Sequence, residues 1–243
     1  PSNGLFANQT WCISPAPLPL GEKLAQELDF LGRVLLQFYR AVNLLYRRSV
    51  EGKQPGWVAR WLDLGKPAAL VALQRHAAFK QDLPRVIRPD ILLTDGSFVI
   101  TELDSVPGGI GLTAWLNQTY SSAQLGTRSA ENATLNPQPS TLNLLGGSRG
   151  MLDGFAGIFG DAAQVHIVVS EESATYRPEM EWIASQLGTS RFKVQDSNFD
   201  GFSSGDAIYR FFELFDLANV PNAARIFELA TVRQVRLTPP PKP

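Results

Sequence analysis

With 243 residues, 44% of them hydrophobic, and a net charge of −1, the chain is long enough for one large domain or two ordinary ones around a real core. No Lys/Arg cluster interleaved with aromatic residues stands out, which argues against a nucleic-acid surface. Cys12 is the single cysteine, so an internal disulfide is excluded, and no apolar run reaches membrane-spanning length. No signal-peptide pattern opens the chain, so the sequence predicts a cytoplasmic protein.

The first ordered element is predicted to be a long amphipathic helix over residues 22–50. Its apolar residues recur at alternating steps of four and three, which places them on one helix face. These residues are Leu24, Leu28, Leu31, Leu35, Phe38, Val42 and Leu45. We expect this face to pack in a core. Two further helices are predicted over residues 57–64 and 68–80, separated by a Gly-Lys-Pro break.

A β-hairpin is predicted after these helices, within residues 88–104. Two short apolar runs, 91–93 and 98–100, flank Asp95-Gly96, a dipeptide that favours tight hairpin turns because Gly accepts a positive φ. Asp90 begins the first strand, and Glu102 and Asp104, two residues apart, close the second on one face. Because the strands are antiparallel, Asp90 should lie beside that pair.

Carboxylates that converge in this way repel one another unless a positive charge offsets them or their pKa values rise. Oxygen clusters suit hard cations such as Mg²⁺, which takes one or two carboxylates together with water and phosphate oxygens. Arg88, two residues before Asp90, offers a fork for a phosphate or a carboxylate. The alternative is an exposed hairpin whose acids are simply solvated, and spacing alone does not choose between the two.

A glycine-rich loop follows the hairpin and leads into a helix predicted over residues 112–120. Gly108, Gly109 and Gly111 would let backbone amides approach a ligand closely, and the helix N-terminus at this loop favours anions. The next segment, 121–150, is rich in Ser, Asn, Pro and Gly and is predicted to be a linker or mobile loop.

The C-terminal part, residues 151–243, alternates predicted helices and strands. An apolar run at 165–170 indicates a buried strand, a helix is expected up to Leu187 with Gly188 as its C-cap, and further strands are expected near 192–196 and 235–238. Residues 207–212 are either another strand or the start of a helix, and their aromatic residues favour a strand. This alternation predicts a parallel α/β layer, with ligands beyond the carboxyl ends of its strands. Arg210, inside an aromatic run, should need an acidic partner, either Glu213 or Asp216, or a bound anion.

Taken together, the pattern Arg-x-Asp, hairpin, Glu-x-Asp, x-x-Pro-Gly resembles the closing segment of the ATP-grasp ligases. The resemblance implies that Asp90, Glu102 and Asp104 bind Mg²⁺ and that Arg88 contacts the acyl phosphate or the substrate. It further implies a substrate-binding loop at Gly108 and Gly109, with Thr113 as its hydroxyl. Asp104 stands where Asn is commoner in that family, and the motif covers only about a tenth of the chain.

The order of the parts, with the metal motif before the α/β layer, is similar to the circularly permuted ATP-grasp branch, which includes glutathionylspermidine-synthetase-like and glutathione-synthetase-like proteins. The resemblance implies an α/β fold, α+β in its N-terminal part: the C-terminal half of an ATP-grasp fold over residues 1–120, the linker, and a pre-ATP-grasp domain over 151–243. The half that clamps the nucleotide would lie in a missing segment or a second chain, so the isolated chain is expected to be inactive.

The resulting hypothesis is a part of an ATP- and Mg²⁺-dependent ligase that joins small-molecule or peptide carboxylates to amines through an acyl phosphate. Two alternatives remain at this stage. One is a non-catalytic ligand-binding module on a degenerate ATP-grasp fold, and the other is a divalent-metal hydrolase that uses the same acids.

Overall fold

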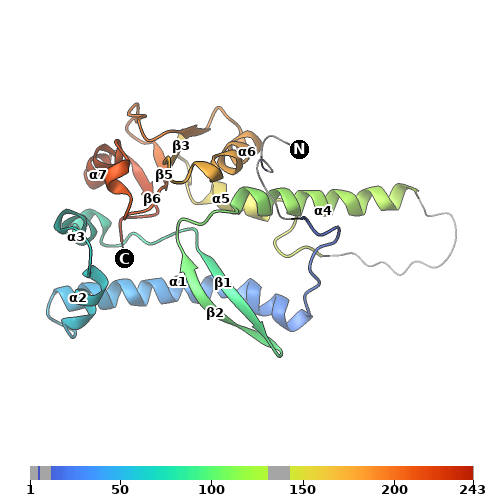
Figure 1. Ribbon diagram of the computed structural model, residues 1–243, viewed down its shortest axis with the longest axis horizontal. Helices are drawn as coiled ribbons and strands as arrows, with labels where there is room; N and C mark the ends of the chain where they lie inside the picture. Colours follow the sequence, from blue (N-terminus) through green and yellow to red (C-terminus); the bar gives the residue numbers. More distant parts are fainter. Residues whose placement is uncertain (1–4, 6–11, 131–142, 243) are drawn as a thin grey trace.

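The computed structural model describes residue 5 and residues 12–130 and 143–242, and its N-terminal part consists of helices followed by a hairpin (Figure 1). The elements of this part are α1 (Glu22–Val50), α2 (Trp57–Asp63), α3 (Ala68–Arg75), the 3₁₀ turn η2 (Ala77–Phe79), β1 (Arg88–Thr94), β2 (Ser97–Asp104) and α4 (Ile110–Ala130). In Figure 1 the hairpin crosses beside α1, and α4 projects away from the body of the molecule. No helix among the described residues is both long enough and apolar enough to cross a membrane.

The C-terminal part is a four-stranded parallel sheet with helices on both faces. Its elements are α5 (Gly150–Gly157), β3 (Val165–Val169), η3 (Ala174–Tyr176), α6 (Arg177–Leu187), β4 (Phe192–Gln195), β5 (Ala207–Phe211), η4 (Leu217–Asn219), α7 (Ala223–Thr231) and β6 (Arg236–Thr238). The strand order is β4-β3-β5-β6, and each neighbouring pair is parallel. The expected mixed α/β class and its parallel layer are therefore confirmed.

Two cores form because alternate residues of the buried strands point to opposite faces of the sheet. Val165 and Ile167 of β3 face α5 and α6, whereas Val168 faces α7. The N-terminal part contributes to both cores: Val106, Ile110 and Ala114 pack into the first, and Phe79 packs into the second. The start of α4 is therefore anchored in the same core as the central strand of the sheet.

The hairpin has the predicted position and turn. Thr94 pairs with Ser97, which leaves Asp95 and Gly96 as a two-residue turn, and Gly96 has a φ of 98°. The register places Arg88 opposite Asp104 and Asp90 opposite Glu102. A bulge between Asp90 and Ile91 interrupts the ladder just beyond these pairs, as bulges next to functional sites often do.

The long helix α1 forms where the 3–4 spacing predicts it, but its apolar stripe is only partly buried. Leu31 and Leu35 are buried, whereas Phe38 is 49% exposed and Leu45 41% exposed. None of the described residues of α1 belongs to either core, because α1 lies beside the hairpin and not against the sheet (Figure 1). Periodicity predicts which face of a helix is apolar, but it does not show what covers that face.

α4 also differs from expectation, since it continues to Ala130 instead of ending near Tyr120. The predicted linker therefore begins with helix, and its centre, residues 131–142, lies outside the described residues. Asn117 Nδ2 donates to the carbonyl of Gly147 at 3.3 Å, which ties α4 to the turn before α5. The division into units at 1–120, 121–150 and 151–243 stays a prediction.

Candidate functional site at the base of the hairpin

Arg88, Asp90 and Asp104 meet at the open end of the hairpin. Arg88 Nε donates to Asp90 Oδ1 at 2.9 Å, and Arg88 Nη2 lies 3.4 Å from Asp104 Oδ2. Strand pairing brings them together, because Arg88 and Asp90 are two residues apart on one strand and Asp104 is the cross-strand partner of Arg88. The guanidinium therefore supplies the positive charge that the two carboxylates need.

Glu102 lies opposite Asp90 in the ladder and is exposed. Within residues 12–130 and 143–242, no three acidic, histidine or cysteine side chains come together in a group that could hold a metal ion. Asp90, Glu102 and Asp104 thus lie on one face of the hairpin, but their three carboxylates do not form a cluster that could hold a metal ion. Their role as metal ligands stays a prediction.

The donor set nonetheless fits a magnesium ion that arrives with a phosphate. Mg²⁺ keeps several waters and takes only one or two protein carboxylates when substrate phosphates fill other positions. Asp90 and Asp104 already share one cationic group, Arg88, and the side chain of Arg88 is 43% exposed, so it has room to move to an anion. Asp90 and Asp104 would hold the ion in that arrangement.

Asp104 also orders the loop that follows the hairpin. Its Oδ1 accepts a hydrogen bond from the backbone amide of Val106 at 2.8 Å, while its Oδ2 faces Arg88. Arg88 Nη1 donates to the carbonyl of Gly108 at 3.4 Å. Because Val106 is buried in the first core, this network connects the two carboxylates firmly to the body of the protein.

The glycine loop packs against η3 and α6. A Cβ on Gly108 would collide with the ring of Tyr176, and a Cβ on Gly111 would lie 2.7 Å from the backbone oxygen of Glu179. Both positions therefore require glycine for close approach. The sequence suggests close approach to a ligand, whereas the neighbours that the structure shows are the chain's own Tyr176 in η3 and Glu179 in α6.

The carboxyl group of Glu179, a residue of α6, caps the N-terminus of α4. Its Oε2 accepts from the amide of Leu112 at 3.1 Å, and the amides of Gly111 and Gly109 also interact with the carboxylate. Burial raises the pKa of Glu179, and these amide hydrogen bonds act in the opposite direction. A carboxyl group lies where the dipole argument predicts an anion. It is an internal carboxylate, however, so these amides do not face an open substrate pocket.

The backbones of Gly109 and Thr113 take part in the first turn of α4. Gly109 has a φ of 86°, a conformation that favours glycine, and its carbonyl accepts from the amide of Thr113 at 2.9 Å. The side chain of Thr113 is exposed. The role of Gly108, Gly109 and Thr113 in binding a substrate stays a prediction. The sequence did not predict that Tyr176 and Glu179 pack against this loop. An acid in the first turn of a helix is common, so Glu179 gave no distinctive signal.

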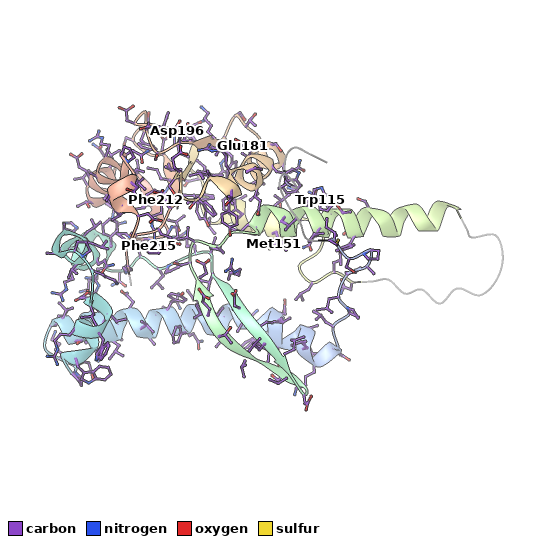
Figure 2. All side chains as sticks on the ribbon, in the orientation of Figure 1. Trp115, Met151, Glu181, Asp196, Phe212 and Phe215 are labelled. Atoms are coloured by element: carbon purple, nitrogen blue, oxygen red, sulfur yellow. The ribbon has the colours of Figure 1, made fainter. Side chains whose placement is uncertain are left out.

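The base of the hairpin lies near the carboxyl end of β5. Burial raises the pKa of the Glu213 carboxyl, the negative charges of Asp104 and Asp216 raise it further, and Arg210 lowers it. Glu213 follows β5, at the edge where parallel sheets bind ligands. In Figure 2, Phe212 lies within the α/β layer and Phe215 on its side facing the hairpin, and Phe215 is 83% exposed.

Arg210 is buried, and its direct partners differ from those expected. Its Nε donates to the carbonyl of Pro239 at 2.9 Å, its Nη1 to that of Phe212 at 2.6 Å and its Nη2 to that of Pro240 at 3.4 Å. Glu213 acts on it only through charge. Burial lowers the pKa of Arg210 to about 10, so it stays charged at neutral pH. Carbonyl oxygens, and not a carboxylate, satisfy this arginine.

Neither the models of protein families, nor the curated proteins, nor the solved structures contain a match to the chain.

Proposed function

We propose that this chain carries the metal- and phosphate-binding corner of an ATP-dependent carboxylate–amine ligase of the circularly permuted ATP-grasp type. The observation that carries the proposal is the shared guanidinium: Arg88 bridges Asp90 and Asp104 at the base of the hairpin. Two carboxylates and an arginine at one point supply both charges that a metal–phosphate complex needs. The resemblance of the motif to ATP-grasp ligases suggests which reaction such a site would serve.

In the proposed reaction, the γ-phosphate of ATP passes to a substrate carboxylate, and an amine then displaces phosphate from the acyl phosphate. Magnesium, when bound, would neutralise the phosphate oxygens. Arg88 would leave the two carboxylates and donate to the oxygens of the transferring phosphoryl group, where charge develops. Asp104 would keep its hydrogen bond to the amide of Val106 throughout, which holds the loop in place.

Asp104→Asn is the sharpest test, because Asn keeps an oxygen for the Val106 amide and loses only the charge. We expect calorimetry to show Mg²⁺-dependent binding of ATP to the wild type, weakened about tenfold or more in the variant because one anionic ligand is lost. Asp95→Asn is the matched control. It removes the same charge from the exposed turn of the same hairpin and should bind like the wild type.

The results also separate the two possible roles of Glu102. If Glu102→Gln weakens binding as much as Asp104→Asn does, Glu102 completes the metal site in the complex. If it has no effect, Asp90 and Asp104 suffice. Equal binding by the Asp104→Asn variant, the Asp95→Asn variant and the wild type would refute the proposed site.

One observation favours the second candidate, a non-catalytic binding module. The carboxylate of Glu179 already takes the amides at the start of α4 that would bind a substrate carboxylate in a ligase. A module of this kind should bind its ligand equally well with and without Mg²⁺. Calorimetry in the presence of a chelator therefore distinguishes the module from the ligase.

A further inference from the structure

A cavity of about 620 Å³ lies at the C-terminal end of α1, beside the segment that follows η2. Figure 1 shows that the C-terminal end of α1 is the end nearest α2, away from the tip of the hairpin. Five cationic residues line it: Arg40, Arg47, Arg48, Lys53 and Lys80. Glu51 is the one acid among its lining residues. A chain whose net charge is −1 thus gathers an excess of positive charge around one cavity.

Most of the described cations around this cavity form no direct ion pair with a carboxylate. Glu51 forms an ion pair with Lys53 at 2.8 Å, and it acts on three of the other four cations, Arg47, Arg48 and Lys80, through charge alone. Within the described ranges, none of those four forms an ion pair with an acid. The negative end of the α1 dipole offsets about half a charge, which is too little to balance them.

Arg47 anchors the wall of the cavity. Its Nη1 donates to the carbonyl of Arg75 at 3.3 Å and its Nη2 to that of Gln74 at 3.4 Å, and its Nε is buried without a hydrogen-bond partner. An unsatisfied buried donor is costly unless a ligand or water completes it. Arg40 and Arg48 are exposed, so their guanidinium groups are available to a ligand from solution.

Lys242 adds a further cation at the rim. Its Nζ donates to Asn43 Oδ1 at 3.0 Å and to the carbonyl of Lys80 at 3.3 Å, and Asn43 and Lys80 both line the cavity. Burial lowers the pKa of Lys242 to about 8, and the charge of Arg47 contributes to this lowering. The crowding of positive charge therefore extends beyond the lining residues themselves.

We propose that this cavity binds a compact soluble polyanion that carries two or more phosphate groups, with Arg40 and Arg48 donating to phosphate oxygens. The volume lies in the range of small-molecule sites. Guanidinium forks suit phosphate oxygens, and several separated cations favour several linked anionic groups over one. This site does not depend on the function proposed for the hairpin.

Inorganic tripolyphosphate, titrated by calorimetry without divalent metal, is the probe. The wild type should bind it, and the double variant Arg40→Ala/Arg48→Ala should bind it about a hundredfold more weakly, about tenfold for each arginine that no longer donates to a phosphate oxygen. The control is Arg33→Ala/Arg60→Ala, which removes two exposed arginines that do not line the cavity and changes the net charge equally. It should bind like the wild type.

Two results would overturn the proposal. The first is equal affinity of the two double variants for tripolyphosphate, which would show that only overall charge matters. The second is binding of inorganic monophosphate as tightly as tripolyphosphate, because a site built for linked phosphates must prefer them. Asp104→Asn should leave tripolyphosphate binding unchanged, so failure here and failure at the hairpin are distinguishable.

Discussion

Replacement of Arg210 by Met is expected to lower the free energy of unfolding by about 3 kcal/mol or more, as judged by urea denaturation. The side chain is 2% exposed, and its three hydrogen bonds hold the carbonyls of Phe212, Pro239 and Pro240. Met fills much of the same volume but donates nothing, so these carbonyls lose a charged donor at about 1–3 kcal/mol for each group left unsatisfied.

Arg225→Met provides the control for Arg210. Arg225 is exposed on α7 and pairs with Glu228 at 2.8 Å, an i,i+3 contact worth about 0.5 kcal/mol or less. A loss in Arg210→Met no larger than in Arg225→Met would mean that Arg210 does not fasten the C-terminal segment to β5. Because Glu213 lies just beyond Arg210, the same change should also disturb the edge of the sheet that faces the hairpin.

The second large effect is expected for Gly111→Ala. Ala is ordinarily the better residue inside a helix, by about 1 kcal/mol. At Gly111, however, the new Cβ would lie 2.7 Å from the backbone oxygen of Glu179, and backbone cannot rotate away. We expect α4 and α6 to be forced apart, at a net cost of about 2 kcal/mol in thermal or urea unfolding.

Gly154→Ala, in α5, should have the opposite sign. Nothing lies within 4 Å of a Cβ built at Gly154, and the residue is exposed in a helix. Its replacement should stabilise the protein by about 0.5–1 kcal/mol. If both variants were stabilised, the contact between the glycine loop and α6 would not exist as described.

Local chemistry made much of the fold predictable. The Asp95-Gly96 turn and its two apolar runs predicted the hairpin, and the turn residues are those that the strand pairing leaves unpaired. Buried strands such as Val165–Val169 follow from mostly apolar runs, here interrupted only by His166, and Gly188 does end α6, with a φ of 101°. These features depend on neighbours in sequence, which a sequence displays directly.

Features set by distant parts of the chain were not predictable in the same way. The glycines at 108 and 111 indicated a close approach, but their partners, Tyr176 of η3 and Glu179 of α6, lie more than 60 residues further along. The face of α1 was identified as apolar, yet Phe38 and Leu45 are exposed because the sheet packs elsewhere. The basic cavity joins α1 to residues 80–83, and no local pattern marks that meeting.

The measurement that tests the central claim most directly is paramagnetic broadening by Mn²⁺ in the presence of ATP, followed by amide NMR. Mn²⁺ takes the same oxygen ligands as Mg²⁺. If Asp90 and Asp104 hold the metal, the amides of Arg88, Asp104 and Val106 should broaden first, and the Asp104→Asn variant should lose the effect. Broadening centred elsewhere, with these amides unchanged, would contradict a metal–phosphate site at the base of the hairpin.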